Sequence, residues 1–338
     1  MANKTIKSLY VTNMYPTAAH PVDGIFIKEQ IQDLSEIIPL QAEVALIDSV
    51  YQGKKEYLKS IFSIPRIIQS KSIDLIHIHY GLSGLFLLFF KPRQKVFLTL
   101  HGSDIQKREK NGWQVWLTKK ILPKADLIFV QNEAMKNLVL PYNQKVEIVT
   151  CGVDTAFFKP ELPAVPKGNS KLILFPSSPS REVKDYPLFN RVIELVKKQL
   201  SHQINIACID NLSRVEVRSL LNRADCLLLT SKTEGSPQVV KEALCCNLPV
   251  VAVPVGDVKE LMEGVPNCRV ASSREVGELA DLLIKTLLEE RGMIRETFLV
   301  KTKYHHQAIA NNLAKHYLQA WGKPNTKPQA FKPAEPVS

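Results

Sequence analysis

The sequence predicts an α/β protein with two doubly wound parallel sheets. The chain has 338 residues, more than one hydrophobic core usually organises, so two domains of roughly 150 residues are expected. Short aliphatic runs alternate with longer amphipathic runs along most of its length, which is typical of βα units. This alternation stops at 159–170, where the proline-rich stretch KPELPAVPKGNS indicates an interdomain linker. In such folds ligands bind at the carboxyl ends of the strands, so the sequence predicts a cleft there.

The first domain is predicted to span residues 1–160. Its strands are expected at 8–12, 43–47, 75–78, 96–100, 127–130 and 146–149. Its helices are expected at 25–37, 55–70, 115–122 and 132–139. The apolar stretch from Leu82 to Phe90 is less than half of the roughly 20 residues that span a bilayer, so it predicts a buried helix.

The second domain is predicted to span residues 171–300. Its strands are expected at 171–175, 204–209, 226–229 and 250–253, and its helices at 188–200, 215–222, 238–246 and 273–289. A final amphipathic helix is expected at 304–321, packing back on the first domain. The tail at 322–338 contains four prolines and few apolar residues, which predicts disorder.

Composition narrows the class of protein. Hydrophobic residues make up 45% of the chain and charged residues 23%, as in globular proteins. The formal net charge of +11 favours anionic partners, but neither half is a dedicated basic arm, so no nucleic-acid partner is expected. No signal sequence is evident, and the six cysteines form no C-x-x-C pair. We therefore expect a cytoplasmic protein with reduced thiols and no structural zinc.

The segment EGSPQVVKEALCCNLP, from Glu234 to Pro249, is the most informative. Ser236 is a good N-cap and Pro237 a good first helical residue, so a helix is predicted to begin there. The free N–H groups at such a helix end suit a diphosphate. Glu242 could then bind the two hydroxyls of a ribose, and Glu234 could reach a sugar. A solvated helix start with ordinary surface glutamates is the alternative.

This segment resembles the E-x7-E motif of retaining family-four glycosyltransferases of the GT-B fold, with Glu234 and Glu242 at the two glutamate positions. The resemblance implies that Glu242 holds the ribose and that Glu234 approaches the donor sugar. It also implies donor contacts from four consecutive residues, Ser236, Pro237, Gln238 and Val239. Asn247 stands where the family usually has glycine, and asparagine also tolerates a left-handed helix end.

Further landmarks resemble the family in the expected order. They are YPTAAHPVDGIFIKEQI, DLIHIHYG, TLHGSD, ADLIFVQNE and CGVDTAFFKP. The resemblance implies that Gly24 lets the backbone approach the donor diphosphate or acceptor, although Asp23 replaces one of the family's usual two glycines and a plain turn glycine is the alternative. It also implies that His101 contacts the reacting sugar, against the alternative of a core histidine. His77 and His79 lie two apart on a strand without a third metal ligand, so we expect them to support the fold.

A basic pair follows the first strand of the second domain, in PSSPSREVKDYP. By resemblance, Arg181 and Lys184 stabilise the negative charge of the departing diphosphate, although the family more often leaves a wider spacing between them. No D-x-D pair occurs in the sequence, so we expect no metal and no cofactor. Transfer would then follow the family's front-face displacement, with the nucleotide sugar as a substrate.

The stretch from Lys107 to Lys124, KREKNGWQVWLTKKILPK, mixes tryptophans with basic residues, as at an anionic membrane interface. We expect Trp113, Trp116, Lys119 and Lys120 to form an acceptor or membrane face, with Asp104 assisting near the acceptor. Tryptophans that pack inward are the alternative. The enzyme would then be peripheral at the inner face of the membrane and act on a glycan or lipid-linked glycan.

The resemblance, together with the missing D-x-D pair, thus implies a retaining, metal-independent hexosyltransferase of polysaccharide biosynthesis that uses a UDP-sugar or GDP-mannose. Two alternatives remain: another GT-B enzyme, such as a nucleotide-sugar epimerase, and a catalytically silent nucleotide-sugar-binding scaffold.

Overall fold

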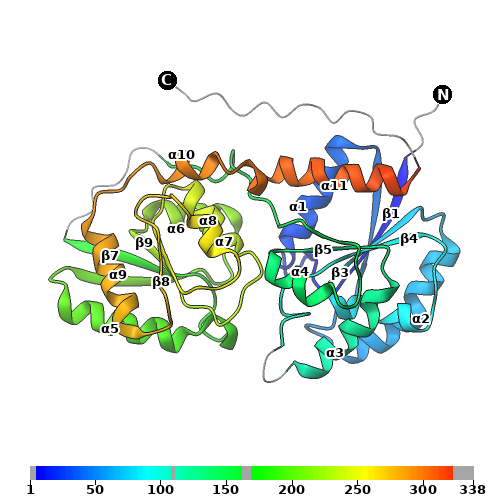
Figure 1. Cartoon of the computed structure of the whole chain (residues 1–338), viewed down its shortest axis with the longest axis horizontal. Coiled ribbons are helices and arrows are strands. Elements are labelled where there is room, and N and C mark those ends of the chain that lie inside the picture. Colours follow the sequence, from blue (N-terminus) through cyan, green and yellow to red (C-terminus); the bar gives the residue numbers. More distant parts are fainter. Residues whose placement is uncertain (1–4, 108–110, 162–168, 323–338) are drawn as a thin grey trace. The chain divides into compact units, whose positions relative to one another are not determined.

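The structure is a computed structural model that describes residues 5–107, 111–161 and 169–322. Part of the predicted linker and the predicted tail from residue 323 onward lie outside these ranges. The chain divides into two compact units (Figure 1). Unit 1 contains residues 1–152 together with 306–338, and unit 2 contains residues 153–305. The final helix therefore belongs to unit 1.

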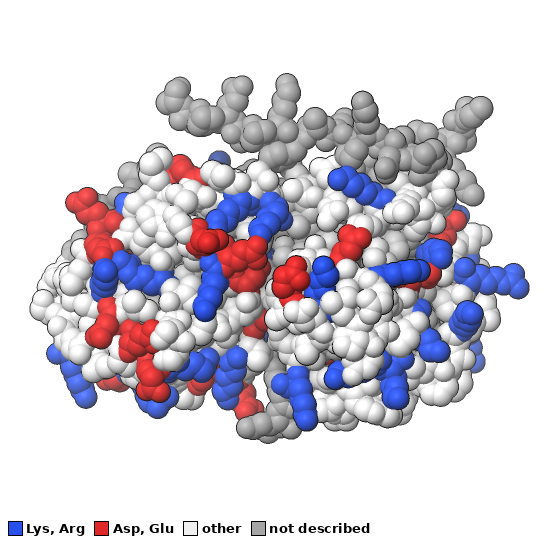
Figure 2. All heavy atoms as spheres, in the orientation of Figure 1, with Lys and Arg blue, Asp and Glu red and all other residues white. Residues whose placement is uncertain are grey.

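Basic and acidic side chains are interspersed over the visible surface of each unit (Figure 2). At the lower right of that view, the margin of unit 1 shows mainly lysine and arginine. None of the helices in the described ranges is both long enough and apolar enough to cross a bilayer.

Unit 1 is built on a six-stranded parallel sheet with the order β2-β1-β3-β4-β5-β6. Its strands are β1 (Ile6–Thr12), β2 (Leu40–Leu46), β3 (Leu75–His79), β4 (Lys95–Thr99), β5 (Leu127–Val130) and β6 (Val146–Ile148). Its α-helices are α1 (Ile25–Ile37), α2 (Lys55–Ser70), α3 (Gly112–Ile121), α4 (Glu133–Val139) and α11 (His306–Ala320). The strand order reverses at β1, which lies between β2 and β3, and such a reversal marks the binding edge of doubly wound sheets.

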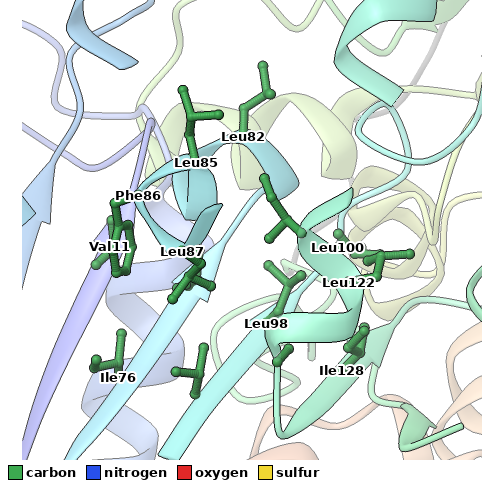
Figure 3. Close-up of a cluster of buried hydrophobic side chains, with 14 of the residues drawn as sticks. Val11, Ile76, Leu82, Leu85, Phe86, Leu87, Leu98, Leu100, Leu122 and Ile128 are labelled. Atoms are coloured by element: carbon green, nitrogen blue, oxygen red, sulfur yellow. The ribbon is translucent and has the colours of Figure 1, made fainter. Parts of the chain in front are cut away.

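Two hydrophobic cores cover the two faces of this sheet. On one face, Phe86 and neighbouring leucines of the 3₁₀-helix η1 (Gly81–Leu88) gather over Val11, Ile76 and Leu98 (Figure 3). On the other face, Leu313 and Tyr317 of α11 join Tyr10, Phe97 and Phe129 of the strands. Helix α11 also packs against α1.

The buried segment after β3 is a 3₁₀-helix that ends at Leu88, and Phe89 is 70% exposed. The predicted buried helix therefore ends two residues too late. Close packing against α3 explains its glycines, because a Cβ added to Gly81 would lie 2.3 Å from Thr118 Oγ1. A short 3₁₀ turn, η2 (Leu122–Lys124), extends α3.

Unit 2 is built on a five-stranded parallel sheet with the order β11-β10-β9-β7-β8. Its strands are β7 (Ser170–Phe175), β8 (Gln203–Cys208), β9 (Cys226–Leu229), β10 (Val250–Ala252) and β11 (Arg269–Val270). Its helices are α5 (Tyr186–Gln199), α6 (Arg214–Arg223), α7 (Gln238–Cys245), α8 (Val258–Met262), α9 (Val276–Leu288) and α10 (Ile294–Leu299), with 3₁₀ turns η3 (Glu182–Lys184) and η4 (Thr302–Tyr304). The sequence pattern missed β11, α8 and α10, because elements this short carry little periodicity.

Candidate functional site

Helix α7 begins at Gln238, as in the expected range 238–246 and one residue after the start expected from Ser236 as N-cap. Pro237 is its N-cap residue, with an extended ψ of 112°, and Gln238 is the first helical residue. The expectation that Ser236 caps this helix is therefore wrong. The Ser236 hydroxyl instead donates to Asp257 Oδ2 at 2.6 Å, which ties the loop before α7 to the loop after β10.

Glu234 and Lys184, both predicted to act at the donor, form an ion pair. Lys184 Nζ lies 2.7 Å from Glu234 Oε1, and the two side chains are 12% and 14% exposed. Their loops follow β7 and β9 and are joined by hydrogen bonds, since Lys232 N donates to the Val183 carbonyl at 2.8 Å. Arg181 lies in the same loop but is exposed, and it donates to Ser177 Oγ at 3.3 Å.

Arg274 and Asp185, which sequence reasoning missed, brace the loop that carries Lys184. Asp185 has a left-handed φ of 54° and caps α5 by accepting a hydrogen bond from Leu188 N at 3.2 Å. Arg274 Nη2 lies 2.6 Å from Asp185 Oδ2 and 2.8 Å from the Thr230 carbonyl. Asp185 just before Tyr-Pro was a readable N-cap signal, whereas nothing in the sequence marks Arg274.

Glu242, the residue predicted to hold ribose, is buried in α7 with a side chain only 8% exposed. Arg214, the first residue of α6, places Nη1 2.7 Å from Glu242 Oε1. The guanidinium also lies over the Phe158 ring, 4.6 Å from its centroid. Burial raises the pKa of Glu242 above its ordinary value, while the charge of Arg214 opposes this rise. Ser213 and Glu216 form a capping box at the start of α6, but this local sequence pattern does not indicate that Arg214 pairs with Glu242.

A second buried charged cluster lies beneath the loop before α7. Asp257 is 6% exposed and Lys241 is fully buried. Burial raises the pKa of Asp257, and the charge of Lys241 and the hydrogen bond from Ser236 oppose the rise. Gly256 has a φ of 55°, and a Cβ there would lie 2.5 Å from the Gly235 carbonyl oxygen. Only glycine permits this approach, which fixes the loop that carries Glu234.

In unit 1, His101 follows β4 at the carboxyl edge of the sheet and is partly exposed. Its Nε2 lies 3.1 Å from His79 Nδ1. Burial lowers the pKa of His101 to about 3, so the ring is neutral at physiological pH. A neutral imidazole with one nitrogen engaged can donate or accept a single hydrogen bond to a ligand.

Asp104 does not form part of an exposed face. It is 6% exposed, and its carboxylate accepts hydrogen bonds from the backbone N–H groups of His101, Gly102 and Gly81 at 2.9–3.2 Å. Burial raises the pKa of Asp104, and these backbone donors oppose the rise. The carboxylate shapes the turn that presents His101, and a role near the acceptor stays a prediction.

Gly24 is the N-cap of α1 and has a left-handed φ of 61°. A Cβ there would lie 2.4 Å from the Met14 carbonyl oxygen. The turn alone thus requires glycine. An approach of this backbone to a diphosphate stays a prediction.

His77 is fully buried in the core, where Nδ1 lies 2.7 Å from Tyr317 Oη and Nε2 lies 2.7 Å from Thr99 Oγ1. His79 is 1% exposed. In the residues that the structure describes, no cluster of three histidine, cysteine, aspartate or glutamate side chains could hold a metal. All six cysteines are free thiols.

The tryptophans of α3 face outward. Trp113 is 43% exposed and Trp116 is 59% exposed, so the alternative that they pack inward is wrong. Lys120 Nζ lies 5.7 Å from the centroid of Trp116, and Lys54 Nζ, from the start of α2, lies 4.8 Å from the centroid of Trp113. Lys119 is half-buried. Residues 108–110 of the predicted face lie outside the described residues.

Two family models match the chain, one in each half. Residues 32–157 match Glycosyltransferase Family 4, and residues 170–289 match Glycosyl transferases group 1. An uncharacterised glycosyltransferase of Methanocaldococcus jannaschii is 27% identical over 258 residues, which cover 69% of this chain and 71% of that protein.

Solved structures share the fold. Sucrose-phosphate synthase from Thermosynechococcus elongatus superposes with a TM-score of 0.76 at 14% identity, covering 94% of this chain and 99% of that one. The Anabaena protein HepE in complex with UDP and glucose superposes with a TM-score of 0.70 at 14% identity, covering 93% of this chain and 100% of that one. The two parallel sheets with flanking helices are therefore those of a two-domain, Rossmann-like architecture.

Proposed function

Because this chain belongs to the GT-B glycosyltransferases of the family-four, group 1 type, we propose that it transfers a sugar from a nucleotide sugar to a lipid-linked glycan with retention of configuration. The observation that carries the proposal is the charge arrangement of unit 2. Glu234 pairs with Lys184 before α7, and Glu242 pairs with Arg214 within it. Lys184 and Glu234 lie in the loops after β7 and β9, Glu242 lies in the middle of α7, and Arg214 begins α6, so two buried or half-buried ion pairs involve α7 and the loop before it.

Each pair suits a different part of the donor. Glu242 Oε1 is engaged by Arg214, and a carboxylate has further lone pairs for the hydroxyls of a ribose. Lys184 and the more exposed Arg181 are suited to the diphosphate, whose negative charge grows as the glycosidic bond breaks. Because Lys184 also pairs with Glu234, it couples the position of the sugar-binding carboxylate to that of the phosphates.

The proposed reaction is a front-face displacement without a metal. The bond between the anomeric carbon and the diphosphate breaks, the acceptor oxygen bonds to the same face of the sugar, and the leaving phosphate takes the acceptor's proton. Fixed cations and the amino-terminal end of α7 supply the charge stabilisation that a metal provides elsewhere. The absence of any D-x-D pair in the sequence supports this reading. HepE, of like fold, was solved with UDP and glucose, which supports a UDP-sugar over GDP-mannose.

We further propose that unit 1 docks on an anionic membrane to reach its acceptor. Exposed apolar side chains project from two neighbouring helices that both pack on η1. They are Leu58 at 62% and Phe62 at 66% on α2, with Trp113 and Trp116 on α3. Lysines surround them, and Glu56 is the one acidic residue in 54–70 and 111–124. Apolar side chains rimmed by lysine suit the interface of an acidic bilayer.

Ligand-dependent stability tests the donor assignment. The full chain is heated with UDP-sugars, GDP-mannose and free nucleotides, and the cognate donor at a hundred times its dissociation constant should add about 2.7 kcal/mol to the folded state. Glu242→Gln should lose this shift, whereas Glu182→Gln, on the exposed part of the η3 loop, should keep it. No shift with any nucleotide sugar would refute the proposal.

Turnover distinguishes an enzyme from a silent scaffold. Wild type should release the nucleotide from its cognate donor. Glu234→Ala should still bind the donor but should release the nucleotide far more slowly. Equal nucleotide release by both proteins would contradict the role of Glu234, and no release by either would favour a scaffold.

Flotation with acidic vesicles tests the proposed membrane surface. Wild type should float with the vesicles, and the double variant Trp113→Ala/Trp116→Ala should not. Failure of wild type to float would refute the membrane proposal.

A further inference from the structure

Two histidines meet at the carboxyl edge of the unit 1 sheet. His79 is the last residue of β3, and His101 follows the neighbouring strand β4, with which β3 pairs in parallel. His79 Nδ1 lies 3.1 Å from His101 Nε2. The rings are nearly parallel, with centroids 5.3 Å apart and planes inclined by 20°. One of these two nitrogens must therefore carry the proton that the other accepts.

The surroundings of His79 decide which nitrogen donates. His79 is 1% exposed, and its Nε2 has no hydrogen-bond partner among the residues that the structure describes. If Nδ1 accepted, the neutral ring would carry its proton on Nε2, which would bury an N–H without an acceptor. Buried orphan N–H groups are rarer than under-satisfied acceptors. His79 therefore carries its proton on Nδ1 and donates to His101.

This donation fixes the tautomer of His101. Because His101 Nε2 accepts, the proton of its neutral ring lies on Nδ1. The hydrogen bonds among described residues include none to that Nδ1, and the side chain is partly exposed. Burial lowers the pKa of His101 to about 3 and that of His79 well below its ordinary value, so neither ring is charged near neutral pH.

Aromatic neighbours hold the ring in place. Phe26 and Tyr80 lie 5.1 and 4.5 Å from His101 between ring centroids. Tyr80 adopts a φ of 69°, which is strained for a bulky residue, and its N–H donates to the Thr99 carbonyl at 3.0 Å. Strained backbone of this kind persists where the surroundings require it. Here it keeps an aromatic ring against His101.

We propose that His79 is a positioning residue that holds His101 in the Nδ1–H tautomer, so that His101 donates a hydrogen bond to a hydroxyl of the transferred sugar. His101 then acts as a fixed neutral donor and takes no proton during the reaction. The assignment of a sugar as the ligand rests on the proposed function, whereas the tautomer does not.

The tautomer can be measured directly on the full chain. Protein with ¹⁵N-labelled histidine gives two-bond ¹H–¹⁵N correlation spectra near neutral pH, with His101 assigned from the spectrum of His101→Gln. We expect a protonated Nδ1 and a bare Nε2 at His101. A protonated Nε2 at His101, or a charged ring, overturns the proposal whatever the protein's activity.

Variants test the role of His79. His79→Asn keeps an N–H donor near the position of Nδ1 and should preserve the His101 tautomer, whereas His79→Leu should release it to the Nε2–H form. His77→Gln is the matched control, because it removes the neighbouring buried ring, which bonds to Thr99 and Tyr317 and not to His101. An unchanged tautomer in a folded His79→Leu protein refutes the positioning role.

Binding separates the tautomer from the proposed function. His79→Leu should weaken binding of the cognate nucleotide sugar about tenfold, the loss that one hydrogen bond can cause, and leave binding of the free nucleotide unchanged. His79→Asn should restore sugar binding. If the tautomer is as expected but no nucleotide sugar binds wild type, the proposed function fails and the tautomer assignment stands. Equal weakening for nucleotide and nucleotide sugar would show that His79 supports only the fold.

Discussion

Replacing Arg214 by methionine should expose the energetic cost of burying Glu242. The carboxylate is 8% exposed and the guanidinium 23%. Breaking a buried ion pair from one side typically costs about 3–5 kcal/mol. Because Arg214 is partly accessible, water can replace some of its interaction, so we expect a loss of about 3 kcal/mol in the free energy of unfolding near neutral pH.

The loss should depend on pH. Burial already raises the pKa of Glu242, and removing Arg214 raises it further. A carboxyl whose pKa is higher in the folded state stabilises the fold most below its unfolded pKa of about 4.5 and loses that contribution as pH rises through the folded pKa. The cost of Arg214→Met should therefore be small below about pH 4.5 and grow towards pH 8.

Urea unfolding between pH 4 and pH 8 measures this cost. Arg218→Met is the matched control, since Arg218 lies on the same helix, stacks on Phe157 and pairs with an exposed partner, Glu161, a kind of pair worth about 0–1 kcal/mol. In the background of Glu242→Gln, Arg214→Met should cost much less, because no buried charge is left unpaired. Equal costs for the two arginine variants, or no coupling to Glu242, would refute the reasoning.

Three further predictions follow from the local geometry. Gly24→Ala should lower the free energy of unfolding in urea by about 3 kcal/mol, because the added Cβ meets the Met14 carbonyl and the residue has a left-handed φ. Gly53→Ala is the control: its φ is also left-handed, but the space around it is open, so it should cost about 1 kcal/mol. Lys184→Met should lower kcat by about 10²–10³ in a nucleotide-release assay, and Lys232→Met, on the adjoining exposed loop, should leave it nearly unchanged. Burial lowers the pKa of His101 to about 3, so the free energy of unfolding should fall as pH drops below about 6.5. His101→Gln should lessen this fall between pH 7 and pH 5 by about 1–2 kcal/mol. An unchanged dependence of the unfolding free energy on pH would contradict this burial effect.

The sheet architecture was predictable because it depends on periodicity, whereas the partners of the site residues were not. The strand ending at Thr12 and the helix from Ile25 follow directly from their apolar spacing. The N-cap of α7 was placed one residue early because Ser236 satisfies the sequence rule for a cap, yet its hydroxyl donates to Asp257 in another loop. Tertiary hydrogen bonds of this kind leave no local signal.

Asp104 shows the same limit for site chemistry. It was expected to assist near the acceptor, but backbone N–H groups around it hold the carboxylate inward. Short polar side chains bond readily to nearby backbone, and the sequence does not reveal which of the two outcomes occurs. The family motif indicates Glu234 and Lys184 separately, but it does not indicate that they pair with each other at 2.7 Å.

The last helix has a consequence for synthesis on the ribosome. Unit 2 is a single continuous stretch, whereas unit 1 needs residues 306–320 to cover Tyr10, Phe97 and Phe129. The later-made unit can therefore complete its fold first, although domains usually fold in the order in which they emerge. Until α11 leaves the exit tunnel, α1 covers this face of the nascent sheet without its second helix, and the aromatic side chains that contact Leu313 and Tyr317 lack that cover.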